Sequence, residues 1–490
     1  MNMYDSEVAQ GLLRDAGFDT SSTYEGDGPR NPRSVPDADV VLMNTCSVRE
    51  HAEERVFGRL GMLGKAKRKN PDLILGLMGC MVEEHKDKLF KRFPQLDLMV
   101  GTRNIKELPS LIEEVRQTRR QVSKIKQDGI SIEYTELIQR QGTFHAWLPI
   151  MTGCNKVCTF CIVPITRGSE VSMPAREVYR EASRLVSEGV KCITLLGQNV
   201  NSYNGSPHPT PLPRGEGEKN RAFREGEGGL NSLSLQKGEG GKVEAGFSQK
   251  ISISPAGRGQ GEGGIHFPEL LEMLCGIEGL ERIAFTTSHP QDATEELFRV
   301  IARNPKVSRR FHLPLQSGSD RILKRMKRLH TYDEYKAKIE AMRALIPGVS
   351  VTTDIIAGFS GETEEDHQAT IRALEEIRYA GAYIYKYSLR PATPASKLPD
   401  DVPLTIKDAR NRELLEIQAR ITREINETLI GQTVEVFVEE QNRSNSAEMV
   451  GRTSADKKVV FPASKDLLGR LQKVKLETLR RETFFGMPIV

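Results

Sequence analysis

Apolar runs and amphipathic stretches alternate along the first 120 residues of the chain. Residues 38–43 and 73–78 are short and almost wholly apolar, with a weaker run at 96–100, and such runs are typical of buried strands. Strands that alternate with helices predict a parallel sheet covered on both faces, so residues 1–120 are expected to form an α/β domain. Helical spacing of apolar residues lies between the runs, in residues 7–16, 48–69, 82–93 and 105–115.

A second alternating series occupies residues 140–400. Six apolar runs with helical patterns between them predict a partial (βα)6 barrel, whose chemistry is expected at the carboxyl ends of its strands. The predicted strands are residues 147–151, 191–196, 282–286, 311–313, 350–356 and 382–387. The predicted helices are residues 175–188, 268–275, 293–303, 332–346 and 364–379.

Residues 205–264 interrupt this series. The stretch is rich in glycine, repeats a Gly-Glu-Gly phrase and has no apolar periodicity. Such a composition cannot bury enough apolar surface to offset its ordering entropy, so it is interpreted as a disordered insertion, with a flexible RNA-binding loop as the alternative. Without it, Asn204 joins Ile265 through a strand-to-helix loop of ordinary length.

The last part of the chain changes in character. Residues 404–429 form a highly charged amphipathic pattern, which predicts a connecting helix. From 428 to 490, short β-branched runs are separated by turn residues and the chain ends on an apolar phrase. This pattern predicts a small antiparallel β-barrel.

Composition sets limits on location and partners. Lys and Arg number 70 against 66 Asp and Glu, so the net charge of +4 neither requires nor excludes nucleic acid. The chain has no apolar run long enough for a membrane span, and its polar first residues do not resemble a signal peptide. A cytoplasmic monomer with no membrane association is therefore expected.

The seven cysteines are too few for a disulfide framework in a chain of 490 residues. Cys192 and Cys275 lie in apolar elements and are interpreted as core residues. Cys154, Cys158 and Cys161 instead follow a predicted strand at spacings of four and three residues. Three thiolates on one loop suit a [4Fe–4S] cluster with one open iron, which can chelate S-adenosylmethionine and pass it an electron. A structural zinc site would need a fourth ligand, and no further Cys or His lies nearby in sequence.

Cys46 and Cys80 each follow a predicted strand of the first domain. The carboxyl ends of parallel strands share one edge of a sheet, where functional groups gather. From these residues alone, ligation of a second cluster and burial as simple thiols both remain open.

Five phrases stand out around these cysteines: residues 44–50 (NTCSVRE), 79–81 (GCM), 151–164 (MTGCNKVCTFCIVP), 166–168 (TRG) and 196–203 (LGQNVNSY). Together they resemble the methylthiotransferase family of the radical S-adenosylmethionine superfamily. The subgroup that acts on N6-dimethylallyladenosine in transfer RNA is the most similar, and the resemblance covers nearly the whole chain outside 205–264.

The resemblance implies three domains: a methylthiotransferase domain, a radical S-adenosylmethionine barrel and a TRAM-like RNA-binding domain. It implies two [4Fe–4S] clusters, a radical-forming one on Cys154, Cys158 and Cys161 and an auxiliary one ligated by Cys46 and Cys80. It also implies that a methylthio group is added to C2 of the adenine beside the anticodon of tRNA, with two S-adenosylmethionine molecules and an external electron donor such as a flavodoxin or ferredoxin.

Polar residues near the predicted strand ends are expected around the cofactor. These are Gln198, Asn199, Gln316 and Ser319, and for each a structural role is an equally good interpretation. Ser319 also has the sequence context of a helix N-cap. Four basic residues of the TRAM-like region are expected to contact RNA: Arg443, Arg452, Lys457 and Lys458.

One departure from the family concerns the auxiliary cluster. Relatives begin with a Gly-Cys-Gln-Met-Asn phrase that supplies a third ligand, whereas this sequence begins at Met1-Asn2-Met3. A start codon assigned too late is our hypothesis, and an upstream in-frame stop codon before any such phrase would contradict it. The alternatives to the predicted function are the same chemistry on threonylcarbamoyl-adenosine or a ribosomal-protein aspartate, and a catalytically impaired iron–sulfur RNA-binding protein.

Overall fold

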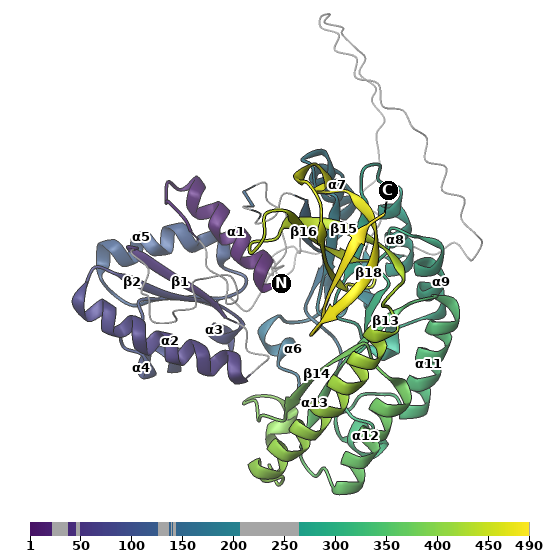
Figure 1. Cartoon of the computed structure of the whole chain (residues 1–490). Coiled ribbons are helices and arrows are strands. Elements are labelled where there is room, and N and C mark those ends of the chain that lie inside the picture. Colours follow the sequence, from purple (N-terminus) through teal and green to yellow (C-terminus); the bar gives the residue numbers. More distant parts are fainter. Residues whose placement is uncertain are drawn as a thin grey trace, which may run out of the picture.

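The computed structural model describes residues 1–21, 38–45, 50–125, 137–138, 140, 144–205 and 264–489. These residues form three regions along the chain, drawn from purple to yellow in Figure 1. None of the helices within these ranges is both long and apolar enough to cross a membrane. The predicted fold class is confirmed: an α/β domain is followed by a partial βα barrel and then by a small β-barrel.

The first region is a parallel four-stranded sheet covered on both faces (Figure 1). Alternation along the central strand explains the two layers: Ile74 and Met78 pack on one face, while Leu75 and Leu77 pack on the other. The strands lie in the order β1 (Val40–Thr45), β2 (Ile74–Gly79), β3 (Leu98–Val100) and β4 (Val122–Lys124). The short β4 was not predicted by the hydrophobic pattern.

Helices complete this region on each side of the sheet. One face is covered by α1 (Asn2–Asp15) and α5 (Leu108–Thr118), which follows η1 (Ile105–Glu107). The other face is covered by α2 (Glu50–Lys69), α3 (Cys80–His85) and α4 (Lys88–Arg92). The sheet is therefore buried between two apolar layers, and its polar chemistry is confined to its edges.

The second region is an open barrel of six parallel strands, as predicted. Two three-stranded ladders meet at an isolated parallel bridge between Ile283 and Val307. Phe285 and Phe311 pack edge to face across this seam, with ring centroids 5.5 Å apart, which adds about 1 kcal/mol beyond area burial. The strands are β5 (His145–Pro149), β8 (Cys192–Leu196), β11 (Arg282–Phe285), β12 (Arg310–His312), β13 (Ser350–Ala357) and β14 (Gly381–Lys386).

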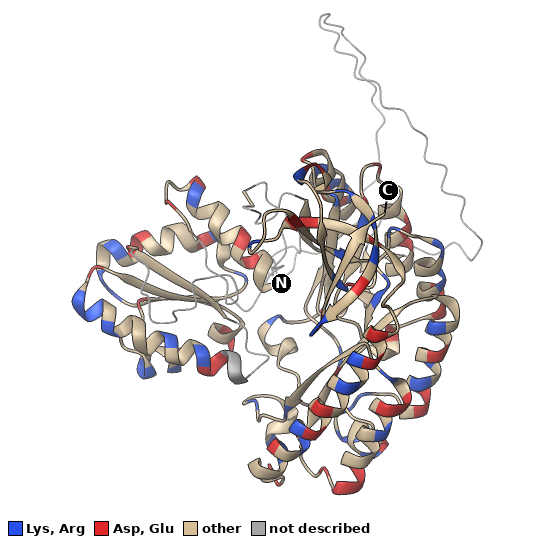
Figure 2. Ribbon diagram, viewed as in Figure 1, with Lys and Arg blue, Asp and Glu red and all other residues tan. Residues whose placement is uncertain are grey.

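Helices cover the outside of the barrel, and most share one apolar core with the strands. The helices are α6 (Val163–Thr166), α7 (Ala175–Ser187), α8 (Phe267–Cys275), α9 (Glu295–Arg303), α10 (Asp320–Arg325), α11 (Tyr332–Leu345) and α12 (Glu364–Ile377). Short elements at the strand ends are β6 (Met151–Thr152), β7 (Val171–Ser172), η2 (Val200–Ser202), η3 (Pro290–Asp292) and η4 (Pro394–Lys397). The outer helices carry both charge signs rather than one (Figure 2).

The predicted insertion at 205–264 lies almost wholly outside the described residues. The chain on either side of it pairs antiparallel, β9 (Asn204–Gly205) with β10 (Ile265–His266). The chain therefore leaves the barrel and returns to it at one place, as the predicted join of Asn204 to Ile265 requires.

The third region is a closed five-stranded barrel reached through a long helix. α13 (Leu404–Glu427) packs on α12 and β14, with Leu414 and Ile421 buried in the core of the large barrel. The small barrel has the strand order β15 (Thr433–Gln441), β16 (Glu448–Thr453), β17 (Lys458–Pro462), β19 (Thr483–Pro488) and β18 (Leu471–Arg480), with η5 (Lys465–Leu467) between β17 and β18. Its pairs are antiparallel as predicted, except that β17 and β19 are parallel.

The small barrel docks on the amino-terminal ends of the large barrel's strands. The backbone oxygen of Ser454, in the β16–β17 turn, accepts hydrogen bonds from the Ser308 hydroxyl and the Arg309 N–H, both at 2.8 Å. Arg310 forms an ion pair with Asp456 of the same turn at 2.5 Å. The opposite, carboxyl-terminal end of the strands remains for the cysteine loop.

Candidate active site

A closed loop between two short strands carries three of the cysteines. β6 pairs antiparallel with β7, so residues 153–170 leave and return at the same point. Gly153 has a φ of +75°, and a Cβ at this position would lie 2.0 Å from the backbone oxygen of Ser169. Only glycine fits there, so backbone geometry fixes the base of the loop.

The middle of the loop is tied to the end of α10. The Thr159 N–H donates to the backbone oxygen of Met326 at 3.0 Å, and the Thr159 hydroxyl donates to that of Arg325 at 3.1 Å. The Thr159 backbone oxygen in turn accepts from the Ala395 N–H at 2.8 Å. Cys154, Cys158 and Cys161 are thus held at the carboxyl ends of the parallel strands, where a barrel of this kind places its chemistry.

The loop does not favour free thiolates. Burial, together with the neighbouring cysteines, raises the pKa of Cys154 above its usual value and raises the pKa of Cys161 to about 12. Metal ligation supplies the positive charge that such buried thiolates lack, and it releases their protons. These cysteines are therefore neutral thiols without a metal, and ligation of a cationic group would release their protons.

The number of cysteines on the loop suits a cluster better than a structural zinc ion. A structural zinc ion takes four ligands, whereas three thiolates on different irons of a [4Fe–4S] cluster leave one iron open. Elsewhere in the described residues, Glu53, Glu84 and His85 are the one set of three His, Cys, Asp or Glu residues whose ligand atoms lie within 4.8 Å of one another.

Gln198 and Asn199, predicted near the cofactor, are adjacent to the loop and have different roles. The Gln198 side-chain oxygen accepts the Gly153 N–H at 2.6 Å, so this side chain anchors the loop. The Asn199 amide donates to Asp292 at 2.6 Å, and Asp292 also binds Lys156 of the loop at 2.8 Å. The amide oxygen of Asn199 is buried without a partner among the described residues, which leaves an acceptor for a ligand.

Gln316 has the same feature on the other side of the barrel. Its side chain is 7% exposed, and its amide oxygen has no partner within the described part of the chain. Its backbone is left-handed, with a φ of +76°, although it is not glycine. A residue held in this conformation costs of order 1 kcal/mol or more, and such residues gather at binding sites. The contact of Gln316 with the cofactor remains a prediction that these two features support.

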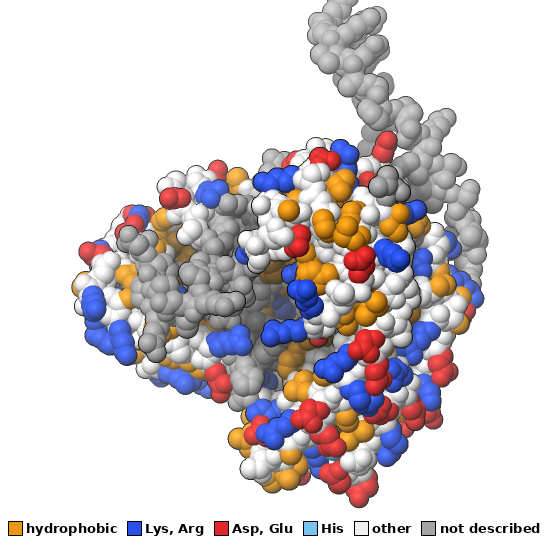
Figure 3. Space-filling model, in the orientation of Figure 1, with side chains coloured by type: hydrophobic (Ala, Val, Ile, Leu, Met, Phe, Trp, Pro, Cys, Tyr) orange, Lys and Arg blue, Asp and Glu red, His pale blue; other side chains and the backbone are white. Residues whose placement is uncertain are grey.

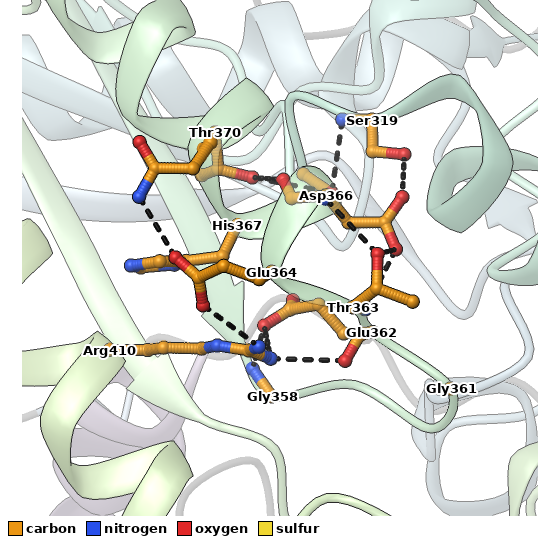
Figure 4. Close-up of polar contacts among 12 residues, drawn as sticks. Ser319, Gly358, Gly361, Glu362, Thr363, Glu364, Asp366, His367, Thr370 and Arg410 are labelled. Atoms are coloured by element: carbon orange, nitrogen blue, oxygen red, sulfur yellow. Dashed lines mark hydrogen bonds and ion pairs between the residues drawn. The ribbon is translucent and has the colours of Figure 1, made fainter.

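Ser319 is occupied within the protein. Its hydroxyl donates to Asp366 at 2.5 Å and accepts from the Ile322 N–H, which makes it the N-cap of α10 (Figure 4). Asp366 also caps α12 through Thr363 and forms an ion pair with Arg321. These contacts favour the structural interpretation of Ser319, and they fix α10, to which the cysteine loop is tied.

Cys80, predicted as a ligand in the first domain, begins α3 directly after β2. The register pairs Thr45 at the end of β1 with Gly79 at the end of β2. A Cβ on Gly79 would lie 2.6 Å from the backbone oxygen of Thr45, so the two strand ends approach too closely for any other residue. Cys46 is outside the described residues, and its ligand role remains a prediction.

A buried arginine joins the two cysteine regions. Arg167 follows α6 at the end of the cysteine loop and is 4% exposed. Its guanidinium donates to Asp5 of α1 at 2.7 Å and also contacts the Cys80 side chain. The backbone oxygen of Arg167 accepts from Arg103 of the first domain at 2.9 Å. Sequence reasoning did not assign this residue a role, because its only signal was its place in the TRG phrase.

The four predicted RNA-binding residues are in different environments. Arg452 forms ion pairs with Asp456 and Glu439 at 3.0 and 3.5 Å, and Lys457 donates to Asn426 at 2.8 Å. Arg452 is therefore paired within the small barrel, while Lys457 connects the small barrel to α13. Arg443 and Lys458 are exposed. RNA contact by any of the four remains a prediction.

Comparison with known proteins agrees with this architecture. Models of three families match: Uncharacterized protein family UPF0004 at residues 1–101, the Radical SAM superfamily at 148–374 and the TRAM domain at 427–489. A radical S-adenosylmethionine methyltransferase from Kitasatospora setae has a similar fold, with a TM-score of 0.51 at 14% identity, covering 80% of this chain and 72% of that one. The fold and the cysteine loop together define a radical S-adenosylmethionine protein.

Curated relatives narrow the assignment. The tRNA-2-methylthio-N(6)-dimethylallyladenosine synthase of Dictyoglomus thermophilum is 39% identical over 98% of this chain and 94% of its own length. The protein of the same name from Carboxydothermus hydrogenoformans is 37% identical over 97% of this chain and 94% of its own length. The chain belongs to the tRNA-2-methylthio-N(6)-dimethylallyladenosine synthase family.

Proposed function

We propose that this protein is a methylthiotransferase that modifies C2 of N6-dimethylallyladenosine next to the anticodon of tRNA. The observation that carries the proposal is the closed loop of Cys154, Cys158 and Cys161 at the carboxyl ends of the barrel strands, facing the Cys80 end of the first domain. The names of the full-length relatives supply the substrate.

The cofactor set follows from the chemistry of these sites. A [4Fe–4S] cluster held by the three loop cysteines, bound with S-adenosylmethionine, supplies the one-electron chemistry that an unactivated C–H position needs. Cys46 and Cys80 are proposed ligands of a second cluster. The electron donor is proposed to be a small redox protein such as a flavodoxin or ferredoxin, and the protein is proposed to act as a cytoplasmic monomer.

Residues of the chain orient these groups. Gln198 holds the base of the loop through Gly153, while Asn199 and Gln316 offer buried amide oxygens to the donors of S-adenosylmethionine. Arg167 holds the first domain against the loop through Asp5. Fixing both cysteine regions before the substrate arrives is the form of preorganisation that positions reacting groups.

The test combines reconstitution with nucleoside analysis. The full chain is reconstituted with iron and sulfide under anaerobic conditions, and its iron content and cleavage of S-adenosylmethionine under a strong reductant are measured. About eight irons per chain are expected for two clusters and about four for the loop cluster alone. In parallel, tRNA nucleosides from a deletion strain are compared with those from the strain that carries the gene.

Loss of 2-methylthio-N6-dimethylallyladenosine in the deletion strain is the expected result. Unchanged levels of this nucleoside, with loss of the threonylcarbamoyl derivative or of a modified ribosomal-protein aspartate, would reject the substrate. Zinc in place of iron on the loop, with no cleavage of S-adenosylmethionine, would reject the chemistry.

A further inference from the structure

One loop cysteine differs from the other two in its surroundings. Cys158 is 9% exposed, and the guanidinium of Arg328 donates to its sulfur at 3.4 Å. Arg328 is itself 4% exposed, and its second terminal nitrogen donates to the backbone oxygen of Pro314 at 2.7 Å. Both terminal nitrogens of the guanidinium are thus hydrogen-bonded, and the charge of Arg328 lies beside the sulfur, away from water.

A histidine approaches the same sulfur. The Nε2 atom of His289 lies 3.9 Å from the sulfur of Cys158, and His289 is 5% exposed. Its Nδ1 accepts the N–H of Gln291 at 3.2 Å, so the proton of the neutral ring is on Nε2 and points toward the sulfur. Arg328 and His289 therefore converge on one atom.

The other loop cysteines have no such partner within the part of the chain that the structure describes. Cys154 accepts from the backbone N–H of Lys156 at 3.4 Å, and Cys161 accepts from the backbone N–H of Val163. Lys156, the nearest basic side chain in sequence, points its ammonium group to Asp292 instead. Among the described contacts of the three loop cysteines, the guanidinium hydrogen bond is particular to Cys158, although the charge of Arg328 also acts on Cys161.

The backbone around Arg328 is shaped to hold it in place. Lys327 and Leu329 on either side have left-handed φ angles of +54° and +56°, and neither is glycine. Left-handed backbone is strained for residues other than glycine, so the turn is not the conformation that these residues would adopt without the surrounding fold. The surrounding fold maintains this turn, and the turn directs the guanidinium of Arg328 toward the cysteine loop.

We propose that Arg328 is a positioning residue that sets the reduction potential of the cluster on the cysteine loop, through its charged hydrogen bond to the Cys158 sulfur. The inference rests on the proposed function, because it needs a cluster at this site. One-electron reduction adds one negative charge to a group already ligated by three thiolates. A buried positive charge and a hydrogen bond to a ligand sulfur stabilise the reduced form more than the oxidised form, so they raise the potential.

The test is a redox titration followed by electron paramagnetic resonance, on full-length protein reconstituted without S-adenosylmethionine. It is done in a Cys80→Ser background, so that a second cluster does not contribute to the signal. In Arg328→Met the iron content is expected to stay at about four per chain while the midpoint potential falls. Arg328→Lys, which keeps the charge on a shorter side chain, is expected to give a smaller fall.

The matched control is Arg325→Met. Arg325 is also at the end of α10 and next to the loop, but its guanidinium donates to Ser360 rather than to a sulfur. Its loss is expected to leave the midpoint potential close to that of the parent protein. Cleavage of S-adenosylmethionine by Arg328→Met is expected to fall severalfold with a mild reductant and to recover with a stronger one.

The outcomes separate the two proposals. If the parent protein holds no iron on the loop, the proposed function fails. If the parent and Arg328→Met hold equal iron and share one midpoint potential, only the role of Arg328 is overturned. If Arg328→Met does not assemble a cluster, Arg328→Lys decides: a lowered midpoint supports the inference, and an unchanged midpoint overturns it.

Discussion

The two cysteine regions of this protein are built in different ways. The radical loop has three sulfurs within residues 154–161, closed at its base by the β6–β7 ladder and by a glycine that tolerates no Cβ. The first domain instead places Cys80 at the end of a strand, where the neighbouring strand end is reached only through the parallel register of β1 and β2. The loop is a local motif, whereas the strand-end site depends on a whole sheet.

The difference extends to the charges that support each region. Each has one buried arginine in contact with a cysteine, Arg328 with Cys158 and Arg167 with Cys80. Arg328 is anchored within its own barrel, on Pro314. Arg167 crosses from the radical barrel to Asp5 in the first domain. The charge beside Cys158 therefore comes from the same barrel, while the charge beside Cys80 comes from the neighbouring domain.

The largest expected effects come from removing one cysteine from each region. Cys158→Ser is expected to abolish both cleavage of S-adenosylmethionine and methylthiolation, because the radical loop loses a ligand. Cys80→Ser is expected to abolish methylthiolation alone, since the loop does not depend on the first domain for its ligands. The measurements are deoxyadenosine release and nucleoside analysis on the same reconstituted samples. Equal loss of cleavage in both variants would show that the loop is not independent.

A second variant tests the charge that Arg167 supplies to the first domain. Arg167→Met leaves the buried Asp5 carboxylate without its partner, which is expected to lower the free energy of unfolding by about 3–5 kcal/mol. Denaturant unfolding of the apoprotein measures this loss, read from probes in the first domain. The control is the double variant Asp5→Asn with Arg167→Met, which removes both charges and is expected to recover part of the loss. No recovery in the double variant would mean that the ion pair is not the stabilising contact.

Sequence reasoning found the local region and missed the contacts between regions. The spacing of Cys154, Cys158 and Cys161 is visible in the sequence because the whole ligand set lies on one loop. The roles of Arg167 and Arg328 are not visible, because each is defined by a sulfur or carboxylate far away in the chain. For Ser319 the sequence offered both a cofactor contact and a helix N-cap; the N-cap of α10 is observed, and the cofactor contact stays a prediction.

Strands with a continuous apolar run could be predicted because that signal is also local in the sequence. Buried parallel strands are continuous apolar runs, so β2 and β8 stand out in the sequence. β4 has three residues, of which only Val122 is buried, and it has no periodicity to detect. Its pairing depends on β3, which the sequence alone does not place beside it.

A smaller effect is expected at the base of the radical loop. Gln198→Ala removes the acceptor for the Gly153 N–H, which costs about 1 kcal/mol because the group is only partly buried. The iron content after reconstitution is expected to fall only in part, in contrast to Cys158→Ser. Gln291→Ala is the matched control, because Gln291 accepts from Lys156 of the same loop at an exposed position. A fall as large as that of Cys158→Ser would show that closure of the loop, rather than its ligands, limits assembly.

The smallest effect on the two cysteine regions is expected from changes on the small barrel, which carries neither of them. Lys473 and Lys475 of β18 are exposed on its outer face, beside the exposed Met487 and Ile489 that pair with them along β19 and its extension. Figure 3 shows hydrophobic side chains next to Lys and Arg on this face. Basic and apolar side chains together suit a nucleic-acid strand, whose phosphates and bases they contact.

The double variant Lys473→Gln with Lys475→Gln is expected to weaken tRNA binding severalfold and to lower the salt dependence of binding by about one for each phosphate that a lysine no longer neutralises. Iron content and tRNA-independent cleavage of S-adenosylmethionine should not change, because the small barrel docks at the opposite end of the strands from the loop. Lys458→Gln at the predicted site is the matched comparison. If Lys458→Gln weakens tRNA binding more than the double variant does, the RNA binds the face near β17. The prediction of Lys458 from the sequence would then be preferred to the β18 face.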